Sequence, residues 1–374
     1  MNPVIQNCYG YEYDAWLASA CMASATVRKL LEHYGTTEAC YSAVRRNDPE
    51  LQQLIPRRFF QMLSISGTHE NLERYKKTMD KHGIRTIRFQ DPLFPADLDH
   101  ADDPPAILFY QGNTDCIRER SLAIVGSRAA SYSGQKATRK LSLDLSGYDV
   151  TIISGMACGI DACAHSGCLE GGGKTIAVLG SGLDRPYPSD NLMLHDSILD
   201  HGGLIISEYA PGEKALGWHF PVRNRIIVGL SKALILMEAR IRSGSMTSVN
   251  HALAQGKDVF VYPGDPASDS YEGNHQLLRE GGIYFTSARD ILDDLHWLDN
   301  PSTVRQNSDC VQEYKPSTPE EEKVIGALKP GLMSFEQMIV HTGMNPSLLM
   351  STLTILQIRG VIEALPGKQY QIKH

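Results

Sequence analysis

The sequence predicts an α/β protein built on a doubly wound, mostly parallel sheet, with a helical domain before it and a winged-helix domain after it. Short apolar runs rich in Val and Ile recur between residues 121 and 264, as expected for strands buried on both faces. Helical stretches separate these runs, and such alternation favours parallel pairing through helical crossovers. A polar segment without periodicity near residue 300 predicts the second domain boundary.

The first part of the chain, residues 11 to about 82, is predicted to be helical. Residues 13–20, 25–35 and 71–83 place apolar side chains at three- and four-residue spacing, and Gly35 and Gly83 fit helix ends. Residues 90–113 are rich in Pro and Asp, which predicts a connector leading into the sheet.

The sheet elements alternate along the middle of the chain. The predicted strands are 121–126, 150–155, 174–181, 203–209, 233–239 and 258–264, with an edge strand near 283–285. The predicted helices are 133–147, 162–172, 191–203, 223–231 and 246–256.

The end of the chain predicts three helices and a hairpin, which together form a winged-helix pattern. Thr318 is the expected N-cap of the first helix, and Asn345 followed by Pro346 starts the third. The hairpin is expected around Pro366-Gly367. A winged helix usually presents its third helix to DNA, but here only Arg359 charges that helix, so duplex binding and a docking or dimer role both stay open.

Composition predicts an ordinary globular protein of the cytosol. The chain has 374 residues, 42% of them hydrophobic, and a net charge of −7. No apolar run approaches the roughly 20 residues that span a bilayer, and no secretory signal is visible at the N-terminus. The eight cysteines form no CxxC pair and the histidines no HExxH, so we expect reduced thiols, no metal and no catalytic set.

An anion site is predicted where the strands end, because ligands of doubly wound sheets lie beyond the carboxyl ends of the strands. Glycine, serine and arginine follow several strands there. The segment from Lys214 to Lys257 contains seven Lys or Arg residues and one acidic residue, Glu238. The unpaired N–H groups at the starts of helices also attract phosphate. The candidate binding residues are Gly126, Ser127, Arg128, Gly155, Met156, Arg223, Asn224, Arg225, Arg240, Arg242, Ser243, Gly244 and Ser245. Lys174 is added to them by the resemblance described below, although the strand pattern places it at the other end of its strand. Phe220, Tyr187 and Tyr209 could add aromatic faces for bases.

The usual mononucleotide motifs are absent. Gly180-x-Gly182 lacks the third glycine of GxGxxG, and Gly173-Lys174-Thr175 has Cys168 where GxxxxGK[ST] needs its first glycine. Asp161 is expected to be a helix cap. Glu208 and Glu238 end buried strands, where we expect them to pair with arginines.

The sequence blocks of the sheet region resemble the bacterial DNA-processing protein A family (DprA, also called Smf). The blocks are residues 125–128, 154–169, 172–188, 206–209, 220–231, 238–248, 261–264 and 273–278. The helical N-terminus is similar to the family's sterile-alpha-motif-like domain. The resemblance implies a domain at 1–83, an extended Rossmann-like domain at 84–297, a linker at 298–316 and a winged helix at 317–374.

The resemblance also implies a function. Members are non-catalytic proteins, without cofactor, that bind single-stranded DNA, protect it during natural transformation, load the recombinase RecA and act as homodimers. Their binding positions correspond to Ser127, Arg128, Lys174, Arg225 and Arg240. Many members have Arg where this chain has Cys158.

Two other functions stay open. The same type of sheet occurs in nucleotide-processing enzymes of the phosphoribohydrolase-like Rossmann group, which carry PGGxGTxxE, whereas residues 243–248 here contain no glutamate. The third alternative is an interaction scaffold that binds no nucleic acid.

Overall fold

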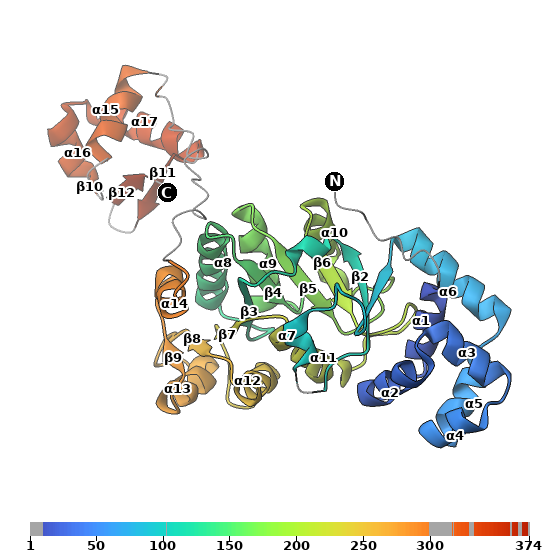
Figure 1. The fold of residues 1–374 in the computed structure, drawn as a ribbon. Coiled ribbons are helices and arrows are strands. Elements are labelled where there is room, and N and C mark those ends of the chain that lie inside the picture. The colour runs from blue at the N-terminus through green and yellow to red at the C-terminus, as the bar shows by residue number, and fades with distance from the viewer. Residues whose placement is uncertain are drawn as a thin grey trace. The chain divides into compact units, whose positions relative to one another are not determined.

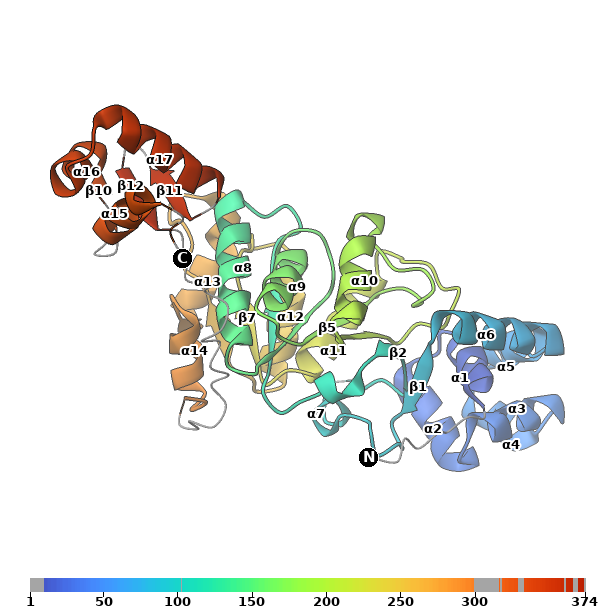
Figure 2. The ribbon, with the colours of Figure 1, turned by 90° about the horizontal axis from the view of Figure 1, so that it is seen from above.

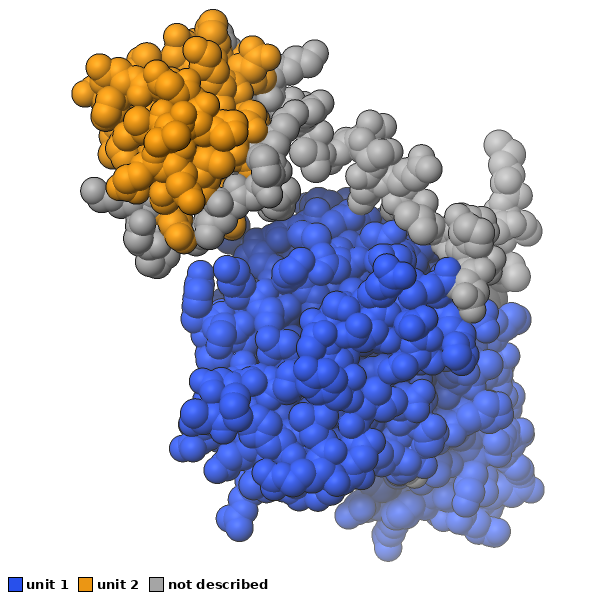
Figure 3. Space-filling view, turned by 90° about the vertical axis from the view of Figure 1, so that its left-hand side faces the viewer, with its two compact units in different colours: residues 1–305 blue, residues 306–374 orange. Residues whose placement is uncertain are grey.

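The computed structural model describes residues 10–101, 103–298, 316, 318–328, 333–359, 361–365 and 369–372. The chain forms two compact units, residues 1–305 and 306–374, which are coloured separately in Figure 3. Residues 299–315 of the predicted linker (298–316) and the predicted turn at Pro366-Gly367 lie outside the described residues.

The first unit begins with six helices, as the apolar periodicity predicts. Gly35 and Gly83 end the second and sixth helices with positive φ angles of 80° and 64°, which suit glycine. The relation to a sterile alpha motif stays a prediction. These helices are α1 (Tyr11–Ala18), α2 (Ser24–Tyr34), α3 (Thr37–Arg45), α4 (Pro49–Leu54), α5 (Arg57–Ser66) and α6 (His69–His82).

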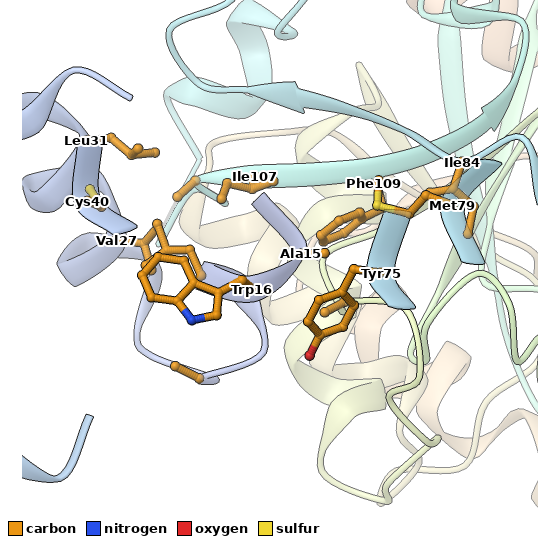
Figure 4. Close-up of a cluster of buried hydrophobic side chains, with 14 of the residues drawn as sticks. Ala15, Trp16, Val27, Leu31, Cys40, Tyr75, Met79, Ile84, Ile107 and Phe109 are labelled. Atoms are coloured by element: carbon orange, nitrogen blue, oxygen red, sulfur yellow. The ribbon is translucent and has the colours of Figure 1, made fainter. Parts of the chain in front are cut away.

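The helices share one hydrophobic core with an edge of the sheet. Figure 4 shows Trp16 and Tyr75 of the helices in the same cluster as Ile107 and Phe109 of strand β2 (Ile107–Gly112). Trp16 is fully buried, and its indole N–H donates to the carbonyl of Leu63 at 3.1 Å. Because the core is continuous, the helical part belongs to the first unit.

A nine-stranded sheet of order β1-β2-β6-β5-β4-β3-β7-β8-β9 forms the centre of the first unit. Strands β3 to β9 pair in parallel, with Leu122 opposite Ile152 and Ala123 opposite Leu234. The six predicted strands and the edge strand are confirmed. The strands are β1 (Arg85–Arg88), β2 (Ile107–Gly112), β3 (Ser121–Val125), β4 (Thr151–Ser154), β5 (Thr175–Leu179), β6 (Leu204–Ser207), β7 (Ala233–Leu236), β8 (Val259–Val261) and β9 (Ile283–Tyr284).

The prediction of a connector over residues 90–113 is wrong at its end. Residues 107–112 form β2, which pairs antiparallel with β6 on one side and β1 on the other. The Pro- and Asp-rich residues before β2 fold instead into short turns and helix α7 (Ala96–Asp99), so local composition hid a strand that the neighbouring β6 stabilises.

Helices cover both faces of the sheet (Figures 1 and 2). Helices α8 (Tyr132–Ser146), α9 (Ile160–Glu170), α10 (Leu192–Asp200) and α14 (Ala288–Asp294) lie on one face. Helices α7, α11 (His219–Gly229), α12 (Ser245–Ala254) and α13 (Glu272–Arg279) lie on the other. The chain runs outward from β3 through β4, β5 and β6, then returns to place β7 on the other side of β3. The strand order therefore reverses between β3 and β7, which is where sheets of this class bind ligands.

The second unit has the predicted three helices and hairpin strands. They are α15 (Pro319–Leu328), α16 (Phe335–Thr342), α17 (Pro346–Ile358), β10 (Met333–Ser334), β11 (Ile362–Leu365) and β12 (Gln369–Ile372). Thr318 accepts the N–H of Glu321 at 3.3 Å and Asn345 caps α17, so both predicted caps are confirmed. The exposed face of α17 carries Leu348, Met350 and Ile355 and no charge.

Candidate nucleic-acid interface

The loops that follow β3 and β7 are joined directly at the point where the strand order reverses. The N–H of Ser127 donates to the carbonyl of Glu238 at 2.7 Å. Gly126 allows this approach, because a Cβ there would lie 2.6 Å from Cγ1 of Ile160 and 3.0 Å from that same carbonyl oxygen. The backbone at this edge is thus fixed before any ligand binds.

A cation and two aromatic rings form a cluster beside this junction. The guanidinium of Arg128 lies over the ring of Phe220, 4.6 Å from its centroid. The ring of Tyr187 lies 5.7 Å from that of Phe220 and is half exposed. A Cβ at Gly180 would lie 3.2 Å from Phe220, so the aromatic pair covers the end of β5. Rings and guanidinium planes of this kind stack on nucleobases.

The loop after β7 supplies exposed positive charge. Arg240 and Arg242 are exposed, and within the described residues neither guanidinium group has a hydrogen bond or an ion pair. Ser243 and Ser245 share a hydroxyl–hydroxyl hydrogen bond of 2.7 Å, and Asn224 donates to the carbonyl of Gly244 at 3.5 Å. Both guanidinium groups are therefore available to phosphate.

The loop after β4 is held by the buried carboxylate of Asp161. The carboxylate of Asp161 accepts the N–H groups of Gly155 and Ala157 at 3.2 and 3.3 Å. Burial raises the pKa of Asp161, and nearby Arg223 opposes this effect. Met156, also a predicted binding residue, is fully buried with a φ of 57°. It contributes no surface.

The prediction that Asp161 caps its helix is wrong in detail. Gly159 is the N-cap of α9, and Asp161 lies in the first turn. Its carboxylate binds the two N–H groups of the preceding loop instead, so it orders that loop and not the helix end.

Two of the five predicted arginines are internal. Arg223 is buried under Gly155, where its Nη1 donates to the carbonyl of Val178 at 2.8 Å, and burial lowers its pKa to about 10. Arg225 is 4% exposed and holds the Glu208 carboxylate at 2.7 and 2.8 Å. The structure does not place either side chain on the surface, which corrects the prediction that both line the groove.

Lys174 lies at the amino ends of the parallel strands, opposite the loops that hold the other candidate residues. It precedes β5, and its ammonium donates to the carbonyl of His201 at 2.7 Å, before β6. The six residue steps from Lys174 to Gly180 span about 20 Å of extended chain. The structure therefore separates Lys174 from the other candidate residues.

The two strand-end carboxylates differ in their partners. Glu208 pairs with Arg225, as expected. Glu238 pairs with no arginine among the described residues, which corrects that expectation: it is fully buried and accepts the N–H and the hydroxyl of Ser131 at 2.9 and 2.6 Å.

Internal pairing reduces the local charge excess between Lys214 and Lys257. Lys232 pairs with Asp97 at 2.7 Å, and Lys257 donates to three carbonyls at the end of α11. Of the seven cations, Lys214, Arg240 and Arg242 remain exposed. The surface formed by residues 214–257 therefore carries far fewer free positive charges than the count of lysines and arginines in this segment suggests.

Sequence reasoning missed Ser131 and Tyr132, which start α8. The hydroxyl of Ser131 caps the helix by accepting the N–H of Gly134 at 3.1 Å. A serine immediately before a helical stretch was the signal that could have identified this N-cap.

No metal or membrane feature appears in the parts of the chain that the structure describes. These residues contain no cluster of three His, Cys, Asp or Glu side chains that could hold a metal ion. None of the helices described above is long and apolar enough to cross a bilayer. The six described cysteines are free thiols, and all but Cys21 are at least partly buried.

The fold and the edge together define a class: a doubly wound α/β protein whose strand-order reversal carries exposed arginines and aromatic rings, with a winged-helix unit in the same chain. The chain belongs to the DNA recombination-mediator protein A family, whose model matches residues 85–296. The model of the DprA winged helix domain matches residues 311–368.

Individual relatives agree with this assignment. DNA processing protein DprA of Streptococcus pneumoniae is 43% identical over 228 residues, which are 59% of this chain and 80% of that protein. Protein Smf of Escherichia coli is 34% identical over 313 residues, 83% of each chain.

Two solved structures share the fold. The X-ray structure of DprA from S. pneumoniae has a TM-score of 0.65 at 34% identity, covering 76% of this chain and 97% of that one. The structure of DprA from Helicobacter pylori, described for its single-stranded DNA binding mode, has a TM-score of 0.52 at 28% identity, covering 57% and 95%.

Proposed function

We propose that this protein binds single-stranded DNA along the carboxyl edge of the sheet, which is the row of loops that follow the carboxyl ends of the parallel strands. We propose that it acts there as a recombination mediator. In this role it protects incoming strands during natural transformation and delivers them to RecA, as a homodimer in the cytoplasm. The observation that carries the proposal is the Arg128–Phe220 stack over the end of β5, together with Arg240 and Arg242 on the loop after β7, whose exposed guanidinium groups have no partner among the described residues. The single-stranded DNA binding mode described for the H. pylori relative supports it.

The chemistry of the edge suits an unpaired strand. Single strands need cations that neutralise phosphates and flat groups on which bases stack. Arg128, Arg240 and Arg242 supply the charge, while Phe220 and Tyr187 supply the rings. Each neutralised phosphate changes the slope of log affinity against log salt by about 0.7, so three arginines predict a slope near −2.

A titration of fluorescent single- and double-stranded oligonucleotides at two salt concentrations tests the proposal. Arg128→Ala and Arg240→Ala should each weaken single-strand binding and lower the salt slope by about 0.7. Arg279→Ala, which removes an exposed cation from the end of α13, is the matched control and should change neither. A double variant of Arg128 and Arg240 that binds normally at physiological salt would refute the assignment of the edge.

The proposal includes no catalytic step. The carboxylates near the edge hold other groups of the protein: Asp161 holds the loop after β4, Glu208 holds Arg225, and Glu238 holds Ser131. Release of free base from nucleoside monophosphates by the pure protein would favour a nucleotide-processing enzyme instead.

A further inference from the structure

Tyr132 is an exposed aromatic residue at the carboxyl edge that the binding cluster described above does not include. It is the first residue of α8, and its side chain is 84% exposed. Within the described residues its ring has no aromatic, cationic or hydrogen-bonded partner. An exposed aromatic ring is stabilised when a ligand covers it. Whether Tyr132 can contact the same ligand as the arginines depends on where it lies relative to them.

The backbone that carries Tyr132 is fixed to the end of β7. The preceding residue, Ser131, donates its N–H and its hydroxyl to the buried carboxylate of Glu238 at 2.9 and 2.6 Å. Gly134 makes room for this carboxylate, because a Cβ there would overlap Oε2 of Glu238. The ring therefore extends from a rigid base, which lowers the entropy lost on binding.

The same contact brings Tyr132 to the arginine loop. Arg240 and Arg242 follow Glu238 by two and four residues, and both are exposed. Arg128, at the other end of the β3 loop, instead reaches Phe220 over the end of β5. The β3 loop thus carries one stacking group on each side of the junction between β3 and β7.

We propose that Tyr132 is a second nucleobase-stacking site for the bound single strand, on the β7 side of the junction, with Glu238 as its positioning residue. This inference rests on the proposed single-strand binding. From β5 to β7 there are three interstrand spacings, about 14 Å in all, so Tyr132 and Phe220 contact different bases. Arg128 beside Phe220, and Arg240 and Arg242 on the loop after β7, bind phosphates of the same strand.

Fluorescence anisotropy with the full chain and a labelled oligothymidine tests the site, with a matched oligonucleotide containing abasic residues. Tyr132→Ala should weaken binding of oligothymidine by about 5- to 150-fold, the range expected for one stacked base. Its salt slope should stay unchanged because no phosphate contact is lost, whereas Arg240→Ala should lower the slope by about 0.7. Tyr132→Phe should bind normally.

The abasic strand separates stacking from general damage. Tyr132→Ala should lose much less affinity for the abasic strand than for oligothymidine. Leu253→Ala, which removes an exposed apolar side chain from the far end of α12, should have no effect on either. Equal losses on both strands, or normal binding by Tyr132→Ala, would overturn the inference; if Arg128→Ala still weakens binding, the proposed function survives. A wild-type chain that binds no oligonucleotide overturns both.

Discussion

The ion pair between Arg225 and Glu208 allows a sharp test of how the arginines divide between structure and DNA. Arg225 is 4% exposed, and its Nη2 lies within 2.8 Å of both carboxylate oxygens of Glu208 and 3.2 Å from the hydroxyl of Ser24 in α2. The pair therefore joins α11 to the strand end and to the N-terminal helices. Replacing Arg225 by Met keeps much of the volume but removes the charge.

The expected loss follows from the burial of the pair. Removing one partner of a buried ion pair leaves the other charge uncompensated, which costs about 3–5 kcal/mol. The Glu208 side chain is 19% exposed, so water moderates the penalty, and we expect about 3 kcal/mol for Arg225→Met. At 2–4 °C per kcal/mol for a unit of this size, the melting temperature should fall by about 6–12 °C.

Calorimetry and anisotropy together give the answer. Adding Glu208→Gln to Arg225→Met removes the orphaned charge, so the double variant should recover part of the loss, with a coupling of about 1–3 kcal/mol. Single-strand affinity, measured well below the melting temperature, should match the wild type in both variants. Arg225→Met that melts normally but binds DNA poorly would refute the reasoning and place Arg225 in the interface.

Three further changes test other parts of the structure. Lys174→Ala should leave single-strand affinity unchanged in the same titration, because Lys174 lies at the opposite edge of the sheet; a clear loss would contradict that placement. Burial lowers the pKa of His165 to about 3, so between about pH 6.5 and pH 3 only the unfolded state takes up a proton at this residue, and the free energy of unfolding should fall as the pH falls through this range. In urea unfolding, the free energy of unfolding of His165→Gln should therefore differ less between pH 7 and pH 5 than that of the wild type. Gly155→Ala places a methyl group on Arg223 and should weaken both stability and single-strand affinity, and normal values for both would show that the loop tolerates a side chain.

The parallel sheet was predictable because its strands are buried on both faces. Continuous apolar runs such as 121–126 and 233–239 need no knowledge of their neighbours to be recognised. Strand β2 is different, since Pro and Asp precede it and its partner β6 lies almost 100 residues further on. A strand whose stability comes from a distant partner leaves a weak local signal.

The candidate binding site was only partly predictable, because a sequence shows where a charge lies along the chain and not what it contacts. Arg223 and Arg240 are both charged residues near glycine loops, yet one is buried under Gly155 and the other is exposed. Glu238 shows the same limit: nearby arginines suggested a salt bridge, while the fold brings Ser131 to it from more than 100 residues away.

The buried and partly buried carboxylates explain how the proposed binding of a single strand can rely on only a few exposed cations. Asp161 orders the loop after β4, Glu208 with Arg225 holds α11, and Glu238 joins the loops after β3 and β7. Each of these carboxylates fixes the backbone from which the exposed arginines and rings extend. A prearranged edge loses little conformational entropy when a strand binds, so stacking can contribute a large share of the affinity. In an acidic chain of net charge −7, this arrangement favours a short, defined path for single strands over a basic surface that would hold any nucleic acid.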